Sequence, residues 1–198
     1  PAKGRLNQTH SVLELAHIFE DNGATMLSVH TDPQFLGKNE DLVKIRRETS
    51  IPILRKDFII DEYMIYEAKL LGASAVLLIC AILSEEQLRE YLSICDTLGL
   101  SALVEAHNAD EVRGAIKCGA RIIDVNNRNL KDFSVDGANS ARLRAYIPRD
   151  VLFVAESGIT CREDVRRMEA AGADAVLVGE TLMRAEDKSR MLAQLRAD

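Results

Sequence analysis

The chain has 198 residues, of which 47% are hydrophobic and 28% are charged, and its formal net charge is −6. This composition is typical of a soluble globular protein with one substantial core, and the acidic balance argues against a broad surface for nucleic acid or anionic membranes. No apolar run approaches the roughly 18 residues of a membrane span, and no signal peptide is visible.

Cysteine and histidine spacing argues against a metal centre. The cysteines form no CxxC pair and the four histidines form no HExxH motif. Widely spaced cysteines fit a reducing cytosol, so we expect a cytoplasmic protein. Because no linker or low-complexity tract interrupts the chain, we expect a single domain over residues 1–198.

In chain order, a helical segment at residues 11–22 is followed by alternating apolar runs and helical patterns. The apolar runs are short and rich in Val, Ile or Leu, which is typical of parallel strands covered on both faces. They span residues 25–31, 51–57, 74–81, 101–107, 121–127, 151–157 and 174–180. This alternation predicts a parallel α/β fold, either a closed (β/α)8 barrel or an open doubly wound sheet.

The predicted helices carry recognisable start and stop signals. Three pairs have the capping-box spacing, namely Ser84 with Gln87, Asn108 with Glu111 and Thr160 with Glu163. Glycines that tolerate the left-handed conformation follow five helical stretches, at positions 23, 72, 99, 119 and 172. The first helical segment has no strand before it, so a closed barrel would need one more strand upstream of Pro1.

Polar residues close four of the apolar runs: Lys56, Glu105, Asn126 and Glu156. In a (β/α)8 barrel the carboxyl ends of the strands meet at one mouth, where such enzymes carry their catalytic groups. Side chains alternate along a strand, so three of these residues share a face with the apolar residue two positions earlier: Leu54, Leu103 and Val154. The pattern predicts that the charges point into the mouth and favours the barrel over the open sheet.

Each polar residue also has a simpler interpretation, because a single charged group at a strand end is usually solvated. Arg55 and Asp57 have the opposite parity to Lys56, so we expect a supporting ion pair or a helix cap. His107 shares parity with Glu105 and could reach the mouth, but we expect a loop role. No histidine lies beside Cys80 in the sequence, so we expect Cys80 to pack in the core.

Glycines close the last two runs, in "ESGI" with Gly158 and in "VGETLM" with Gly179. Glycine allows backbone N–H groups to approach an anion, and barrels often bind phosphate at the loops after their last two strands. The pair therefore favours a phosphorylated small-molecule substrate, although glycine also simply makes turns.

Several stretches together resemble the indole-3-glycerol phosphate synthase family of tryptophan biosynthesis. They are "PILRKDFIIDEYMIYEAKLLGASAVLLICAIL", "LVEAHN", "VNNRNL", "VAESGI" and "VGETLMRA", and the likeness runs from Pro1 to about the last helix. The resemblance implies a (β/α)8 TIM barrel, here without the family's N-terminal extension and first strand. It also implies closure of the indole ring of 1-(2-carboxyphenylamino)-1-deoxyribulose 5-phosphate with loss of carbon dioxide and water.

The resemblance also implies a role for each matching residue, without a metal or organic cofactor. Lys56 would be the general acid toward the substrate's ketone, Glu105 the acid/base group for loss of the hydroxyl, and Asn126 and Glu156 would orient and stabilise the intermediate. The substrate-binding residues would be Arg128 near the carboxylate and Phe58, Leu77 and Leu130 around the anthranilate ring. The phosphate would be held near Ser157, Gly158, Gly179 and Glu180.

The sequence departs from the family pattern in three places. "PAKG" matches a Pro-Ser-Lys-Gly-like loop with Ala2 in place of Ser, and the loop "TDPQFLGKNEDL" is one residue short. Asp124 stands where the family usually has Gly. Its parity matches Asn126, so we expect a buried carboxylate that pairs with Lys56; the alternative is a bulged strand that turns Asp124 toward solvent or a helix N-terminus.

Two functions follow from this reading. The first is a synthase of this family, acting as a monomer or weak homodimer. The second is a non-catalytic remnant of the barrel that still binds a phosphorylated anion. Another phosphate-binding barrel, such as a phosphoribosylanthranilate isomerase, gives no reason for "LRKDF" and "NNRNL" to occur together. An upstream strand bearing the family's Glu and second Lys would favour the first function.

Overall fold

The computed structural model describes residues 9–129 and 132–197. Its centre is one parallel sheet in which every strand lies beside its neighbours in sequence, in the order β1 to β7. The strands are β1 (Leu27–His30), β2 (Ile53–Lys56), β3 (Ala75–Ile79), β4 (Ser101–Ala106), β5 (Ile122–Asn126), β6 (Leu152–Glu156) and β7 (Ala175–Leu177). The order never reverses as it does in a doubly wound sheet, so the alternative of a doubly wound topology is excluded.

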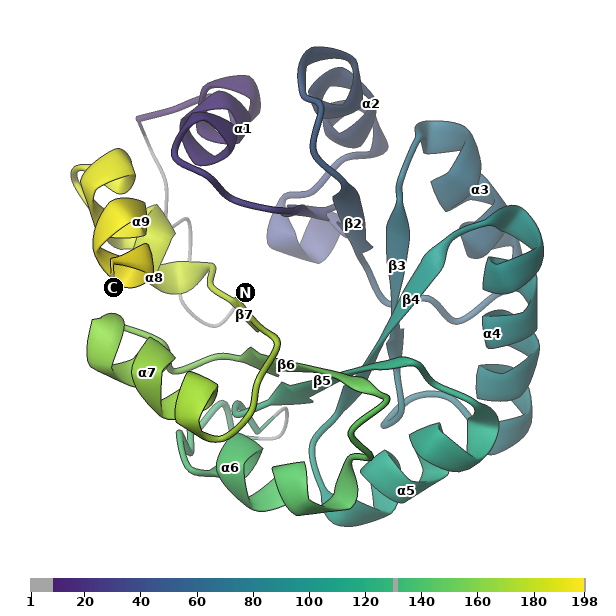
Figure 1. The fold of residues 1–198 in the computed structure, drawn as a ribbon. Coiled ribbons are helices and arrows are strands. Elements are labelled where there is room, and N and C mark those ends of the chain that lie inside the picture. Colours follow the sequence, from purple (N-terminus) through teal and green to yellow (C-terminus); the bar gives the residue numbers. More distant parts are fainter. Residues whose placement is uncertain (1–8, 130–131, 198) are drawn as a thin grey trace.

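The helices lie on the outside of the curled sheet (Figure 1). They are α1 (Val12–Asp21), α2 (Asn39–Glu48), α3 (Tyr63–Leu71), α4 (Glu85–Leu98), α5 (Ala109–Cys118), α6 (Asn139–Leu143), α7 (Arg162–Ala170), α8 (Glu180–Arg184) and α9 (Lys188–Arg196). Short 3-10 turns at Pro33–Phe35 and Arg144–Tyr146 complete the loops. None of the described helices is long and apolar enough to cross a membrane.

The helix boundaries follow the predicted signals with one exception. Ser84 and Gln87 form a reciprocal capping box at the start of α4, and Gly72 closes α3 with φ +91°, a conformation that glycine adopts without strain. The pairing of Thr160 with Glu163 was wrong by one residue. The carboxylate of Asp164 accepts hydrogen bonds from the backbone and the hydroxyl of Thr160 instead, because α7 starts at Arg162.

Apolar side chains fill both faces of the sheet. On the helix side, Ile53, Val76, Val104 and Phe153 are fully buried in the main core. On the inner side, a second cluster consists of buried Leu54, Ala75, Leu77, Ile79 and Leu103, with Ile122, Val154 and Leu177 packed against it. The inner cluster contains the three apolar residues whose parity was used to orient Lys56, Glu105 and Glu156, so that prediction is confirmed.

Within the described residues the sheet ends at β1 on one side and β7 on the other. The outer layer of helices bridges these two ends. α1 packs against α9, and two hydrogen bonds join them: the Asn22 amide donates to Ser189 Oγ at 3.1 Å, and Arg196 donates to the Asn22 carbonyl at 2.9 Å. The arrangement is that of a (β/α)8 barrel with seven of its strands in the described residues. The eighth would lie between β7 and β1 (Figure 1).

Candidate active site

Lys56, Glu105 and Glu156 meet at the carboxyl end of the strands. Lys56 is the last residue of β2. Its ammonium lies 2.5 Å from Glu156 Oε2 on β6 and 3.5 Å from Glu105 Oε2 on β4. All three side chains are largely buried, at 12% exposure for Lys56 and Glu156 and 3% for Glu105. They border one cavity that opens at the mouth and reaches the inner apolar cluster. The predicted convergence is therefore present.

Glu105 is held from two further directions. The Asn126 amide donates a 3.2 Å hydrogen bond to Glu105 Oε1, and His107 Nε2 lies 3.2 Å from the same oxygen. The other ring nitrogen of His107 lies 3.3 Å from Glu111 on α5. His107 therefore lies in the loop after β4, as expected, and its ring also reaches back to the mouth residue Glu105.

Opposite charges shift the pKa values of this group. Burial disfavours the Lys56 ammonium, but the charges of Glu156 and Glu105 outweigh it and raise the pKa of Lys56. Burial also opposes charging of His107, yet Glu105 and Glu111 raise the pKa of His107 to about 9. Burial favours the neutral form of Glu105, while His107 and Lys56 hold its pKa below the ordinary value. At neutral pH Lys56 and His107 are therefore cationic, and Glu105 is an ionised carboxylate between them.

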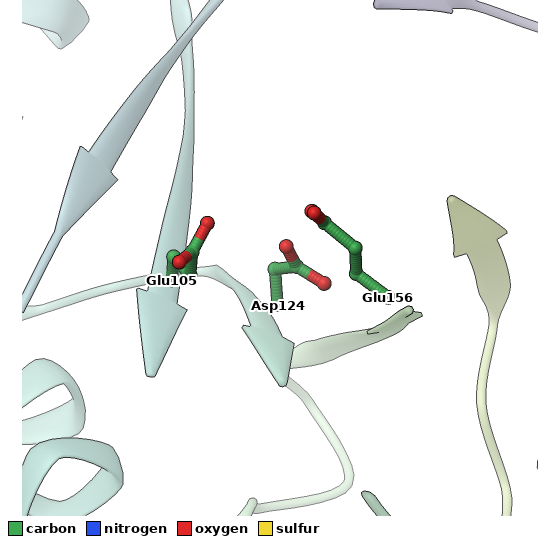
Figure 2. Close-up of side chains that lie close together, drawn as sticks. All are labelled: Glu105, Asp124 and Glu156. Carbon is green, nitrogen blue, oxygen red and sulfur yellow. The ribbon is translucent and has the colours of Figure 1, made fainter. Parts of the chain in front are cut away.

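The side chain of Asp124 lies on the inner face of β5, on the same side as that of Asn126, as parity predicted. Its side chain is completely buried, and its carboxyl lies between those of Glu105 and Glu156 (Figure 2). The predicted ion pair with Lys56 is not formed, because Glu156 and Glu105 share the ammonium. Within the part of the chain that the structure describes, neither oxygen of Asp124 has a hydrogen-bond donor as partner. Burial, followed by the charge of Glu156, raises the pKa of Asp124 well above its usual range.

The neighbours of Lys56 in sequence lie on the other face of β2, as predicted. Arg55 is 3% exposed and lies 2.7 Å from Glu67 on α3 and 3.4 Å from Asp57. Asp57 also accepts a hydrogen bond from the Thr31 hydroxyl. This network ties β2 to its helix. Cys80 is half-buried, and burial raises the pKa of its thiol to about 12, which agrees with packing and not with a nucleophile.

Arg128 follows β5 at the rim of the cavity. Its backbone N–H donates to Asn126 Oδ1 at 2.9 Å, and its guanidinium lies 3.2 Å from Glu180. Glu180, at the start of α8, also pairs with Arg184 at 2.9 Å. Its carboxylate is thus committed to two arginines. Leu130 and the "PAKG" stretch lie outside the described residues.

The loops after β6 and β7 carry the glycines predicted to hold phosphate. Ser157 and Gly158 both have positive φ, at 74° and 78°, and a Cβ on Gly158 would lie 2.7 Å from a methyl carbon of Val135. Gly179 has open space around it. Both glycines border the cavity that contains Lys56, so the two loops predicted to hold phosphate open onto the same space.

An aromatic stack forms one wall of the mouth. The rings of His30 and Phe35 stack with centroids 5.1 Å apart, and Phe35 lies 6.1 Å from Phe58. Phe58 was predicted from the sequence. His30 and Phe35 were missed, because they lie in β1 and the turn after it, outside the motifs that carried the resemblance. Leu77, also predicted, lies deeper, 2% exposed in the inner cluster.

A parallel (β/α)-barrel with a lysine and two carboxylates at the carboxyl ends of its strands defines the class: a barrel enzyme with an acid–base site at its mouth. The family model for indole-3-glycerol phosphate synthase matches residues 1–195. The chain belongs to that family.

Curated relatives agree with this assignment. The indole-3-glycerol phosphate synthase of Lachnoclostridium phytofermentans is 50% identical over 198 residues, covering all of this chain and 73% of the relative. That of Ruminiclostridium cellulolyticum is 51% identical over 197 residues, covering 99% of this chain and 76% of the relative. The chain thus spans about three quarters of each.

Solved structures of distant sequence share the fold. A thiamine phosphate pyrophosphorylase from Pyrococcus furiosus superimposes with a TM-score of 0.73 at 18% identity, covering 93% of this chain and 87% of that one. A mandelate oxidase gives 0.74 at 18% identity, covering 96% and 68%. At this identity the likeness concerns the barrel alone.

Proposed function

We propose that the chain catalyses formation of indole-3-glycerol phosphate from 1-(2-carboxyphenylamino)-1-deoxyribulose 5-phosphate. The observation that carries this proposal is the position of the Lys56 ammonium, which is held by Glu156 and Glu105 beside the aromatic wall of the mouth. A charged donor at this place suits protonation of a ketone oxygen while an aromatic ring attacks the ketone carbon.

The first step forms the carbon–carbon bond. Lys56 donates a proton to the ketone oxygen as the anthranilate ring carbon attacks, and Glu156 keeps the ammonium in place until that transfer. Loss of the ring carboxyl group as carbon dioxide then restores the aromatic ring. The stack of His30, Phe35 and Phe58 holds the ring by apolar contact, and Leu77 forms the floor.

The second step removes the new hydroxyl group as water. We assign this acid–base task to Glu105; the hydrogen bond from Asn126 and the nearby charge of His107 support the assignment. Arg128 lies at the rim, where it can pair with the substrate carboxylate. That pairing requires Arg128 to exchange its present partner, Glu180.

The phosphate is assigned to the loops at Ser157, Gly158 and Gly179. Positive φ at Ser157 and Gly158 turns successive backbone amides, an arrangement that can bind an anion. The Glu180 carboxylate repels a phosphate, and Arg184 stays as its partner when Arg128 turns to the substrate, so we assign only the backbone N–H of Glu180 to phosphate binding.

The direct test is turnover. Purified protein is incubated with the substrate, and indole-3-glycerol phosphate is followed by its indole absorbance and fluorescence, with released carbon dioxide measured in parallel. Equimolar appearance of both products is the expected result. A folded chain that binds the substrate without turnover would instead support the alternative function, a non-catalytic barrel that binds a phosphorylated anion.

A further inference from the structure

Asp124 is a completely buried carboxyl group without a hydrogen-bond donor. Its exposure is 0%, and neither oxygen has a partner among the described residues. An ionised carboxylate in such a place would cost several kcal/mol of stability. Asn126, two residues further along β5, satisfies its own side chain through Glu105 and Arg128. Among the described residues, the site therefore has one more carboxyl group than the surrounding donors satisfy.

Each charged group that faces Asp124 is already engaged. Glu105 lies beside it in the register of β4 and β5, and oxygens of Glu105, Asp124 and Glu156 all lie within 4.8 Å of one another. Lys56, facing from β2, is shared by Glu156 and Glu105. His107, behind Glu105, is shared by Glu105 and Glu111. Neither of these two cations pairs with Asp124.

A proton resolves this conflict. Burial and the charge of Glu156 both favour the neutral form of Asp124, and a neutral carboxyl group has one hydrogen to donate. Both oxygens of Glu105 already have partners: Asn126 and His107 approach its Oε1, and Lys56 lies near its Oε2. Glu156 is therefore the suitable acceptor. Two neighbouring carboxyl groups that share one proton are a known way to avoid two like charges at close range.

We propose that Asp124 is a positioning residue that keeps a proton at neutral pH and donates it in a hydrogen bond to Glu156. The bond fixes Glu156 as the partner of Lys56. Because a protonated Asp124 carries no charge, Lys56 also releases its proton more readily than it would above an ionised Asp124. The part of this proposal that concerns catalysis rests on the proposed function, whereas the protonation state of Asp124 does not.

The same oxygens are also close enough to hold a divalent cation. The Lys56 ammonium argues against that occupant, because it already lies 2.5 Å from Glu156, and a metal ion would have to displace it. Binding of a divalent cation at these oxygens would overturn the proposal.

The first test measures unfolding against pH for the wild type and Asp124→Asn, which has the same shape but no ionisation. If Asp124 has a raised pKa in the folded state, only the unfolded state releases this proton at intermediate pH. The wild type then loses stability relative to Asp124→Asn as pH rises above about 4, by up to tenfold in the unfolding constant per pH unit. Asp150→Asn, on the surface, controls for the loss of a carboxylate as such.

The opposite slope, with the wild type gaining on Asp124→Asn as pH rises, would mean that Asp124 is ionised and paired, and would overturn the proposal. A flat difference would overturn it too. Infrared spectra at pH 7 give a second measurement: the carbonyl band of a protonated carboxylic acid is expected in the wild type and absent in Asp124→Asn. Stabilisation of the wild type by Mg²⁺ or Mn²⁺ that is lost in Asp124→Asn would assign the cluster to a cation instead.

Turnover separates positioning from simple space filling. Asp124→Leu removes the donated hydrogen bond and is expected to lower kcat roughly tenfold, the effect of about one hydrogen bond, with a smaller change in KM. Asp124→Asn retains an N–H donor toward Glu156 and is expected to recover most of that loss. Equal kcat in both variants would overturn the positioning role. If no variant or wild type shows turnover, the proposed function fails while the pH and infrared results still decide the state of Asp124.

Discussion

The Lys56 ammonium lies 2.5 Å from a carboxylate oxygen of Glu156, a residue one hundred positions further along the chain. The two residues end strands on opposite parts of the sheet, β2 and β6, and the curvature of the sheet brings them together. Because both side chains are nearly excluded from solvent, their attraction is screened far less than that of a surface pair. A charged lysine is thereby maintained at the mouth.

Lys56→Ala is expected to reduce kcat at least about a hundredfold, the usual size of a general acid–base contribution. Circular dichroism should show the wild-type fold. Lys44→Ala is the matched control, because the Lys44 side chain is 59% exposed and pairs only weakly with Asp41 at 3.8 Å. A folded, active Lys56→Ala protein would contradict the general-acid role.

His107 should make stability depend on pH. Its pKa is raised to about 9 from 6.5, so its favourable interactions with Glu105 and Glu111 are fully present below about pH 6.5 and are lost as pH rises through about 9. The wild type should therefore exceed His107→Gln by on the order of 3 kcal/mol near pH 6, with little difference near pH 10. Thermal unfolding from pH 6 to 10 measures this, with exposed His17→Gln as the control. A constant difference across that range would refute the charged state of His107.

Inorganic phosphate should bind at the loops after β6 and β7 and raise Tm by mass action. Gly179→Glu introduces a negative charge where a Cβ meets nothing within 4 Å, so it should abolish the phosphate-dependent rise without unfolding the protein. Gly179→Gln has the same size and no charge, and should retain more of the rise. Equal responses of the two variants would indicate that phosphate binds elsewhere.

Arg55 should matter for stability and not for chemistry. Removing it by Arg55→Met leaves Glu67 and Asp57 without their buried cation, which should cost about 3–5 kcal/mol. Arg121→Met is the control: its pair with Asp96 is largely exposed, at 70% and 51%, and should contribute less than about 1 kcal/mol. Urea unfolding measures both. Comparable losses in the two variants would contradict the structural role of Arg55.

Phe35 should contribute mainly to substrate binding. Its ring is 41% exposed and stacks on His30, so Phe35→Ala removes part of the aromatic wall without opening the core. KM is expected to rise about tenfold, as for loss of one aromatic contact of roughly 1 kcal/mol plus its buried area. Tyr63→Ala, at 67% exposure on α3, is the control. An unchanged KM in Phe35→Ala would place the anthranilate ring elsewhere.

The strands and the direction of their side chains could be predicted from the sequence because both depend on local patterns. Alternation along β2 placed Leu54 and Lys56 on one face and Arg55 on the other, and the structure agrees. The same rule turned Asp124 inward. Which cation each carboxylate would take could not be predicted, because that choice depends on distances across the barrel.

His107 and Phe35 show what local patterns leave out. His107 is the first residue after β4, and Phe35 lies in the 3-10 turn that follows β1. In such loops the turn decides how far a side chain reaches toward its partner. Glu111, on the following helix, accepts the backbone N–H of His107 at 2.7 Å and thereby turns its ring toward Glu105. The spacing from His107 to Glu111 was the available signal, since it allows a contact across the start of a helix.

Arg55 and Lys56 are adjacent, yet Arg55 pairs with Glu67 in the helix layer and Lys56 pairs with Glu156 at the mouth. A single-residue insertion or deletion within Pro52–Arg55 would exchange their faces. It would drive a guanidinium into the cavity and an ammonium into the apolar layer beneath α3, and would remove the partners of Glu67 and Glu156 together. Insertions and deletions of whole codons should therefore be far less tolerated in this strand than in the surface loops. A scan of single-residue insertions and deletions along the chain should find few functional variants in β2.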